Sequence, residues 1–212
     1  MLESAPKGSM ARILRPALLL LLCFSPLLVM GWQLTTENLG PDPAKALMQG
    51  TGEWSLRGLI LVLSVTPLAH LLWPAAHKYR RALGLTIFGY SSIHLLLFLQ
   101  VYVGWTGVLL LEELQERPYI FVGFVAWLLL LPLAITSTRR ARRLMGQRWR
   151  YLHLLVYPAA LLAWLHLFWM ARSDVGEALI YGLLVGSPFV WRIWRVTRKR
   201  RFLSQLSATM ID

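Results

Sequence analysis

The feature of this sequence that most constrains its fold is a set of long, uncharged apolar runs separated by short charged segments. A helix that crosses a bilayer needs about 20 consecutive apolar residues, and several of these runs reach that length. The composition agrees, since 57% of the residues are hydrophobic and the mean hydropathy is +0.54. Backbone polar groups inside lipid must be satisfied within the segment, so an all-α integral membrane protein is expected.

Six spans are predicted, forming one transmembrane domain over residues 16–195 between a short tail (1–15) and a basic tail (196–212). The first span is interpreted as an uncleaved helix, because its apolar core is long and a convincing small-residue cleavage site is absent from the sequence. Three further segments are predicted between spans: a Gly/Pro-containing loop (35–53), a turn (104–107) and a short interfacial helix (108–115). The predicted spans are residues 16–34, 58–76, 82–103, 118–138, 151–171 and 175–194.

The charged residues predict the orientation of these spans. The net charge is +12, and most of the 22 lysines and arginines fall in the tails and in two connecting segments, residues 77–81 and 139–150. Most of the ten acidic residues fall in the alternate connections. Positively charged loops stay on the cytoplasmic side, so both termini are predicted to be cytoplasmic. Topology and contact with anionic lipid explain the basic runs, and nucleic acid is not expected as a partner.

Two histidines occur in one predicted span, His153 and His166. Ionisable residues inside a membrane are costly and call for a reason. Each ring could simply hydrogen-bond to a neighbouring helix. Alternatively, a neutral imidazole is a common axial ligand of haem iron. The two lie thirteen positions apart, a rise of roughly 20 Å but an angular offset of roughly 140° on an ideal helix, so their spacing alone does not establish a pair of stacked haems.

Depth within the membrane predicts which histidines could meet. Counted from the last basic residue before each span, His94 and His166 lie within roughly 5 Å of the same level, whereas His153 lies roughly 15 Å closer to the inner face. His94 and His166 are therefore predicted to hold one haem in the outer half. His153 has no evident partner; His70 is either a further ligand or a core residue, and His77 is expected to be a solvated loop residue.

Any such haem would be held without covalent attachment. The chain has one cysteine, Cys23, and the sequence contains no Cys-x-x-Cys-His motif. One or two haems b are therefore expected. Arg80, Arg81 and Arg148 could contact haem propionates or a flavin phosphate. The sequence has no glycine-rich dinucleotide fingerprint, so direct binding of NAD(P)H is not expected.

Several motifs together resemble one known family. They are HLLLF beginning at His94, GPDPAKALMQGTGEW, SVTPLAH, RRALGLTIF, and the string ERPYIFVGFVAWLLLLPLAITSTRRARRLMGQRWRYLHLLVYPAALLAWLHLFW. Over roughly residues 38–170 the chain resembles the MsrQ (YedZ) family, the haem-binding membrane subunits of the bacterial periplasmic methionine-sulfoxide reductase system.

The resemblance implies a six-helix transmembrane domain of ferric-reductase-like type in the bacterial inner membrane. It implies haem-associated histidines at His94, His153 and His166, and an association with FMN. Electrons would come from the quinone pool or a cytoplasmic flavin reductase and pass to a soluble periplasmic molybdopterin-dependent reductase that repairs oxidised methionine. The chain departs from the family pattern at His70, where relatives typically carry arginine.

Three functions are therefore weighed from the sequence. Transmembrane electron transfer is the leading hypothesis. A histidine-relay transporter would be expected to carry intramembrane acidic residues, which the second to fifth predicted spans lack. A non-redox membrane anchor or assembly factor for a periplasmic partner would tolerate loss of the histidines.

Overall fold

The computed structural model describes residues 7–72, 74–171 and 175–209. Residues 1–6 and 210–212 of the two predicted tails, and residues 172–174 before the sixth predicted span, lie outside the described residues. Within the described part, every regular element is a helix. In chain order these are α1 (Lys7–Thr35), α2 (Pro43–Leu71), η1 (Pro74–Tyr79), α3 (Arg80–Phe98), η2 (Leu99–Val103), α4 (Gly107–Glu116), α5 (Pro118–Ile135), α6 (Arg139–Met145), α7 (Gln147–Leu152), η3 (His153–Leu155), α8 (Val156–Met170) and α9 (Val175–Thr209).

Four helical segments in the described part are long and apolar enough to cross a membrane: Pro43–Leu71, Pro74–Val103, Pro118–Ile135 and Gln147–Met170. They correspond to the second to fifth predicted spans. The apolar part of α1, Leu21–Thr35, is shorter. The chain is therefore an all-helical, multi-pass membrane protein, while the first and sixth crossings and the division into tails and domain stay predictions.

The loop expected over residues 35–53 is wrong over its second half, because α2 already begins at Pro43. Asp42 caps this helix by accepting a hydrogen bond from the backbone N–H of Lys45 at 3.0 Å. Proline is tolerated in the first turn, where its missing N–H would have no helical partner. The two glycines read as loop signals, Gly50 and Gly52, therefore lie inside a long helix.

The turn predicted at residues 104–107 is confirmed, since Gly104 and Trp105 both have positive φ, 58° and 61°. Two other segments, the basic connection and the C-terminal tail, contain more helix than expected. The basic segment 139–150 forms α6 and α7, with Thr138 capping the first and Gly146 at φ 53° separating them. The predicted basic tail continues α9 as helix to Thr209.

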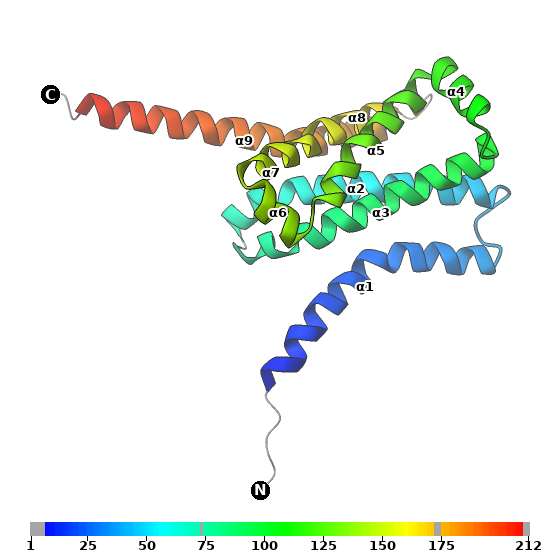
Figure 1. The fold of residues 1–212 in the computed structure, drawn as a ribbon, viewed down its shortest axis with the longest axis horizontal. Coiled ribbons are helices and arrows are strands. Elements are labelled where there is room, and N and C mark those ends of the chain that lie inside the picture. The colour runs from blue at the N-terminus through cyan, green and yellow to red at the C-terminus, as the bar shows by residue number, and fades with distance from the viewer. Residues whose placement is uncertain (1–6, 73, 172–174, 210–212) are drawn as a thin grey trace, which may run out of the picture.

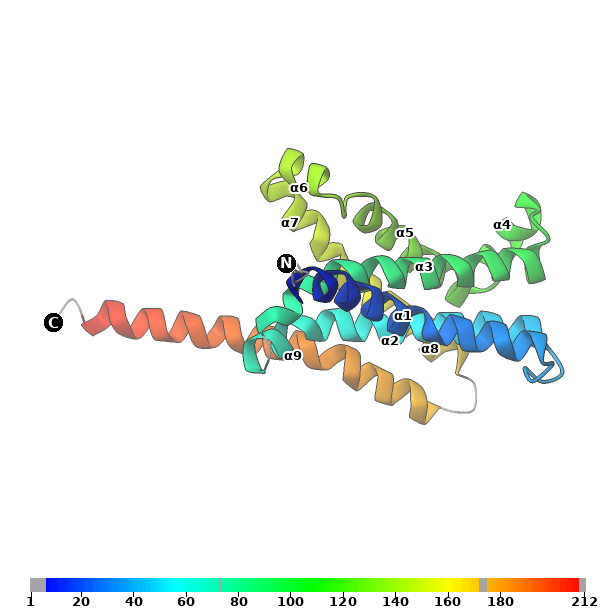
Figure 2. The same cartoon turned by 90° about the horizontal axis from the view of Figure 1, so that it is seen from below.

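Figures 1 and 2 show α2, α3, α5 and α8 side by side in a bundle, with α6, α7 and η1 at one end and α4 at the other. The N-terminal half of α1 leans away from this bundle, and α9 runs on beyond it at the end that holds α6 and α7 (Figure 1). The basic segments 77–81 and 139–150 thus gather at one end, and the acidic helix α4 lies at the opposite end.

Small side chains let the helices approach closely at the centre of the bundle. Ala159 and Ala160 of α8 are completely buried, in one cluster with Leu63 of α2 and Val185 of α9. Close backbone approach through small residues is how helices associate in a membrane, where apolar side chains gain little from leaving lipid.

We expect Ala160→Leu to lower the free energy of unfolding by about 1–3 kcal/mol, because the added carbons must displace packed neighbours. The measurement is thermal unfolding of the detergent-purified protein. Leu161→Ala is the matched control, since the neighbouring Leu161 is 51% exposed and should be near neutral. Equal unfolding temperatures for the two variants would contradict the packing at Ala160.

Candidate functional site

The fold brings His94 and His166 together. His94 lies on α3 and His166 on α8, both half-buried, and their ring centroids are 6.2 Å apart with the ring planes at 75°. The two residues are far apart in sequence, so this meeting is a tertiary contact. The proximity of the two rings agrees with the depth argument, which placed both at one level, and the binding of haem by this pair stays a prediction.

Each ring is oriented by a hydrogen bond to the backbone of a helix other than its own. His94 Nδ1 lies 2.8 Å from the carbonyl oxygen of Met48 on α2, and His166 Nδ1 lies 2.6 Å from that of Tyr119 on α5. A carbonyl oxygen can only accept, so Nδ1 carries the proton and donates it in both rings. The lone pair is then on Nε2, the tautomer that outer-shell hydrogen bonds select for metal-ligating histidines.

The spacing of the two rings also fits ligation of one iron atom. Metal–imidazole bonds are about 2 Å long, so two imidazoles on opposite sides of one metal have centroids about 6 Å apart. The observed separation is 6.2 Å. A Cβ on Gly52 or Gly123 would lie only 2.9 or 2.8 Å from the Nδ1 of His94 or His166. Geometry, tautomer and close packing of both rings therefore fit an axial histidine pair for haem.

His153 lies elsewhere, at the end of the bundle that carries the basic segments. It begins η3, the short 3-10 turn that separates α7 from α8. Its ring stacks on Trp149 with centroids 3.8 Å apart, and Nδ1 is 3.1 Å from the Trp149 carbonyl oxygen. This ring too is therefore held by a backbone carbonyl, but on its own segment.

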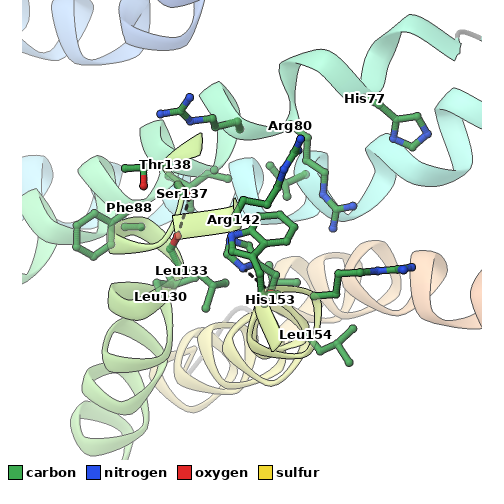
Figure 3. A pocket seen from close by; sticks show the side chains of 18 of the residues that line it. His77, Arg80, Phe88, Leu130, Leu133, Ser137, Thr138, Arg142, His153 and Leu154 are labelled. Carbon is green, nitrogen blue, oxygen red and sulfur yellow. Dashed lines mark hydrogen bonds between the residues drawn. The ribbon is translucent and has the colours of Figure 1, made fainter. Parts of the chain in front are cut away.

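A cavity of about 930 Å³ opens beside His153, as Figure 3 shows. Its apolar wall includes Leu130, Phe88 and Tyr157. Its lining contains no acidic residue among the described part of the chain, so an anionic ligand would meet no repulsion there. The basic side chains in the lining are Lys78, Arg80, Arg81, Arg139, Arg142, Arg143 and Arg150.

Of the three arginines predicted to contact haem propionates or a flavin phosphate, two line the cavity and one does not. Arg80 and Arg81 line the cavity, whereas Arg148 is exposed and is not among the lining residues. Among the histidines of the described chain, His77 shares the cavity with His153 and lies at its edge in Figure 3. Thus His77, expected to be a solvated loop residue, is exposed but belongs to the 3-10 helix η1.

His70 is not brought to His153. It is exposed at the end of α2, stacks against Trp191 at 5.7 Å, and lies 6.1 Å from His77. It is not among the residues that line the cavity. The structure therefore offers no direct support for His70 as a ligand opposite His153.

Sequence reasoning missed Arg192, which lies near the end of the sixth predicted span, residues 175–194. One terminal nitrogen, Nη2, donates to the Thr66 hydroxyl at 3.1 Å, and the guanidinium lies over the ring of Tyr157 at 4.5 Å. The other, Nη1, is buried without a hydrogen-bond partner among the described residues. Because Tyr157 also lines the cavity, Arg192 adds a further cation next to it. An arginine inside an apolar run was the signal available in the sequence.

Comparison with known proteins identifies a membrane family and relatives that are named as heme-binding subunits. Residues 51–164 match the family described as ferric reductase like transmembrane component. The match includes α3 and α5 in full and parts of α2 and α8, so His94, Tyr119 and His153 lie inside it, whereas Met48 and His166 lie just outside it. The chain is 41% identical over 193 residues to a protein of Xanthomonas campestris, with 87% of this chain and 88% of the relative covered. That relative is named protein-methionine-sulfoxide reductase heme-binding subunit MsrQ.

The chain belongs to the MsrQ family. Relatives of the same name occur in Xanthomonas oryzae, 37% identical with 95% of this chain and 96% of the relative covered, and in Polaromonas naphthalenivorans, 37% identical with 92% of each covered. No solved structure matches this MsrQ-family chain. The membrane domain is of the ferric-reductase-like type, as the resemblance implied.

Proposed function

We propose that this protein carries electrons across the bacterial inner membrane by b-type haem, from quinol or a cytoplasmic flavin donor to a periplasmic methionine-sulfoxide reductase. The observation that carries the proposal is the pair His94 and His166, whose rings are 6.2 Å apart, each with Nδ1 bonded to a backbone carbonyl. The relatives are named heme-binding subunits, which supports haem as the group that this pair binds.

The proposed topology has six spans with both termini in the cytoplasm. The basic segments around η1, α6 and α7 gather at one end of the bundle, and acidic α4 lies at the other. This distribution supports an assignment of the basic end to the cytoplasm. The His94–His166 pair would then lie in the outer half of the membrane and His153 near the inner face.

His94 and His166 would be the axial ligands of the outer haem, whose iron supplies reversible one-electron chemistry when bound. The chain's own contribution is orientation. The carbonyls of Met48 and Tyr119 hold each Nδ1 proton, keep Nε2 free as the ligating nitrogen, and increase the basicity of the ligand. The apolar helices around the pair limit access of water.

The cavity beside His153 is the proposed entry point for electrons. His153 would ligate a second haem, and Arg80, Arg81 and the neighbouring cations would pair with its propionates or with the phosphate of FMN. Of the proposed contacts, Arg148 is supported least, because it lies outside the cavity lining. His70 is not included, because its ring packs against Trp191 and His77.

The proposed partner is a soluble, molybdopterin-dependent methionine-sulfoxide reductase that repairs oxidised periplasmic proteins. The relatives are named as subunits of a protein-methionine-sulfoxide reductase, which supports such a partner. The end of the bundle that holds α4 presents Glu112 and Glu116 on its exposed side and is the proposed docking end.

The test is a reduced-minus-oxidised visible spectrum of the detergent-purified protein, with haem quantified per chain. A low-spin b-type spectrum with one or two haems per chain is the expected result, and a ratio near two would assign a separate haem to His153. Protein made with adequate haem supply but free of haem would contradict the proposed function and favour the anchor hypothesis.

A further inference from the structure

The two outer histidines are held by the same local arrangement on two different helices. In α2 the carbonyl of Met48 accepts the His94 hydrogen bond, and Gly52 lies four residues further along. In α5 the carbonyl of Tyr119 accepts the His166 bond, and Gly123 again lies four residues further along. Residues four apart lie on one helix face, so in each case the glycine sits one turn above the accepting carbonyl. We call each arrangement a carbonyl–glycine pair.

The missing Cβ of each glycine is what makes room for the ring. A Cβ at Gly52 would lie 2.9 Å from His94 Nδ1 and 3.0 Å from its Cε1. A Cβ at Gly123 would lie 2.8 Å from His166 Nδ1 and 3.0 Å from both Cε1 and Cγ. Carbon atoms in ordinary contact are about 3.5–4 Å apart, so an alanine at either position must push the imidazole away.

Among the described glycines of α2, α3 and α5, a Cβ would come this close to an imidazole only at these two. A Cβ at Gly58, nearly two turns further along α2, would instead meet the buried side chain of Ile87 at 2.6 Å. A Cβ at Gly89 of α3 would meet nothing within 4 Å. The chain therefore contains glycines with a comparable clash but no histidine, and glycines with no clash.

We propose that Gly52 and Gly123 are positioning residues for the outer haem, which set the hydrogen bonds of its two axial ligands. The inference rests on the proposed function, in which His94 and His166 ligate that haem. Each glycine lets the histidine ring pack directly against the neighbouring helix, α2 for His94 and α5 for His166. The ring Nδ1 can then reach the backbone carbonyl that lies one helical turn before the glycine. A strong Nδ1 hydrogen bond makes the ligand more basic, stabilises the oxidised iron and lowers its reduction potential.

The two carbonyl–glycine pairs are not equal. The Thr51 hydroxyl lies 2.8 Å from the Leu47 carbonyl oxygen and 2.9 Å from that of Met48, so its one hydrogen is divided between them and His94 shares its acceptor in part. The Tyr119 hydrogen bond to His166 is shorter, at 2.6 Å, and a Cβ at Gly123 would lie at 2.8 Å, 3.0 Å and 3.0 Å from three ring atoms, whereas the third ring atom near Gly52 is at 3.6 Å. Gly123 is therefore expected to have the larger effect.

The experiment compares Gly52→Ala and Gly123→Ala with Gly58→Ala and Gly89→Ala in the purified, haem-loaded protein. The readouts are the low-spin electron paramagnetic resonance signal and the midpoint potential of the outer haem. Both positioning variants are expected to shift that signal and raise the potential, with Gly123→Ala shifted further. Gly58→Ala should lower the unfolding temperature without moving either readout, and Gly89→Ala should change neither readout.

If the spectra of Gly52→Ala and Gly123→Ala match that of Gly58→Ala, the inference is overturned while the haem assignment stands. A wild-type protein without haem would overturn the proposed function itself. Should the alanine variants fail to fold, pulsed resonance on wild-type protein with ¹⁵N-labelled histidine gives an independent answer. Strongly hydrogen-bonded Nδ1 nitrogens on both ligands are expected there, and weakly bonded ones would overturn the inference.

Discussion

Replacing His166 with alanine is expected to remove one haem per chain, together with its low-spin spectrum, and to stop electron delivery to the periplasmic partner. The ring centroids of His166 and His94 are 6.2 Å apart, and each ring is held by a different backbone carbonyl, so one ring cannot take over the role of the other. Loss of even an outer-shell partner of a metal ligand costs about 10- to 100-fold in affinity, so loss of the ligand itself should cost more. The measurements are haem per chain and the rate of methionine-sulfoxide reduction by the reconstituted pair.

The design of this experiment includes two comparisons. His94→Ala should produce the same loss as His166→Ala, and the double variant should lose no more haem than either single variant, because in the proposed function both rings ligate one haem. His77→Ala is the control, since His77 is exposed at the cavity edge. Normal haem content in both His94→Ala and His166→Ala would refute the assignment.

The second large effect is expected at the cationic cavity. The double variant Arg142→Gln/Arg143→Gln should slow electron entry from reduced flavin or a quinol analogue by about tenfold or more, because a hydrogen bond to a charged group contributes about 1.5–3 kcal/mol. Both arginines line the cavity beside His153. The measurement is the rate of haem reduction after rapid mixing, at low and at high salt.

The matched control is Arg140→Gln/Arg148→Gln. These arginines come from the same basic segment and are exposed, but they are not among the lining residues, so the change in net charge and in topology signal is identical. This control should change the rate by less than about twofold, since exposed charges act through screened, long-range fields. Equal slowing in both double variants would contradict a specific role for the cavity arginines and assign the effect to the total charge of the basic segment.

The pairing of His94 with His166 could be predicted because it depends on depth, and depth follows from a fixed rise per residue. The angular argument was less informative, because it treated residues 153–166 as one ideal helix. In the structure the 3-10 turn η3 occupies His153–Leu155, so the helical phase is interrupted at His153 itself. A chain can adjust phase in one turn without changing depth much.

The partners of the histidines could not be predicted. The carbonyl that holds His94 comes from a segment interpreted as a loop, because glycines are ordinary loop signals. Only the packed structure shows why they stand in a helix: Gly52 lies against the His94 ring and Gly50 against Met30. The arginines that line the cavity could not be predicted from the sequence either. Arg80, Arg81 and Arg148 look alike in sequence, yet only the first two line the cavity.

The sequence by itself determined the class of the protein, its central spans, the predicted side of its charges and the level of its histidines. These properties are local: they follow from hydropathy over about 20 residues, from charge at span ends and from helical rise. Only the tertiary structure decided which carbonyls orient the rings, which glycines admit them and which arginines surround His153. Those properties depend on how helices rotate and pack against one another, and no single helix contains that information.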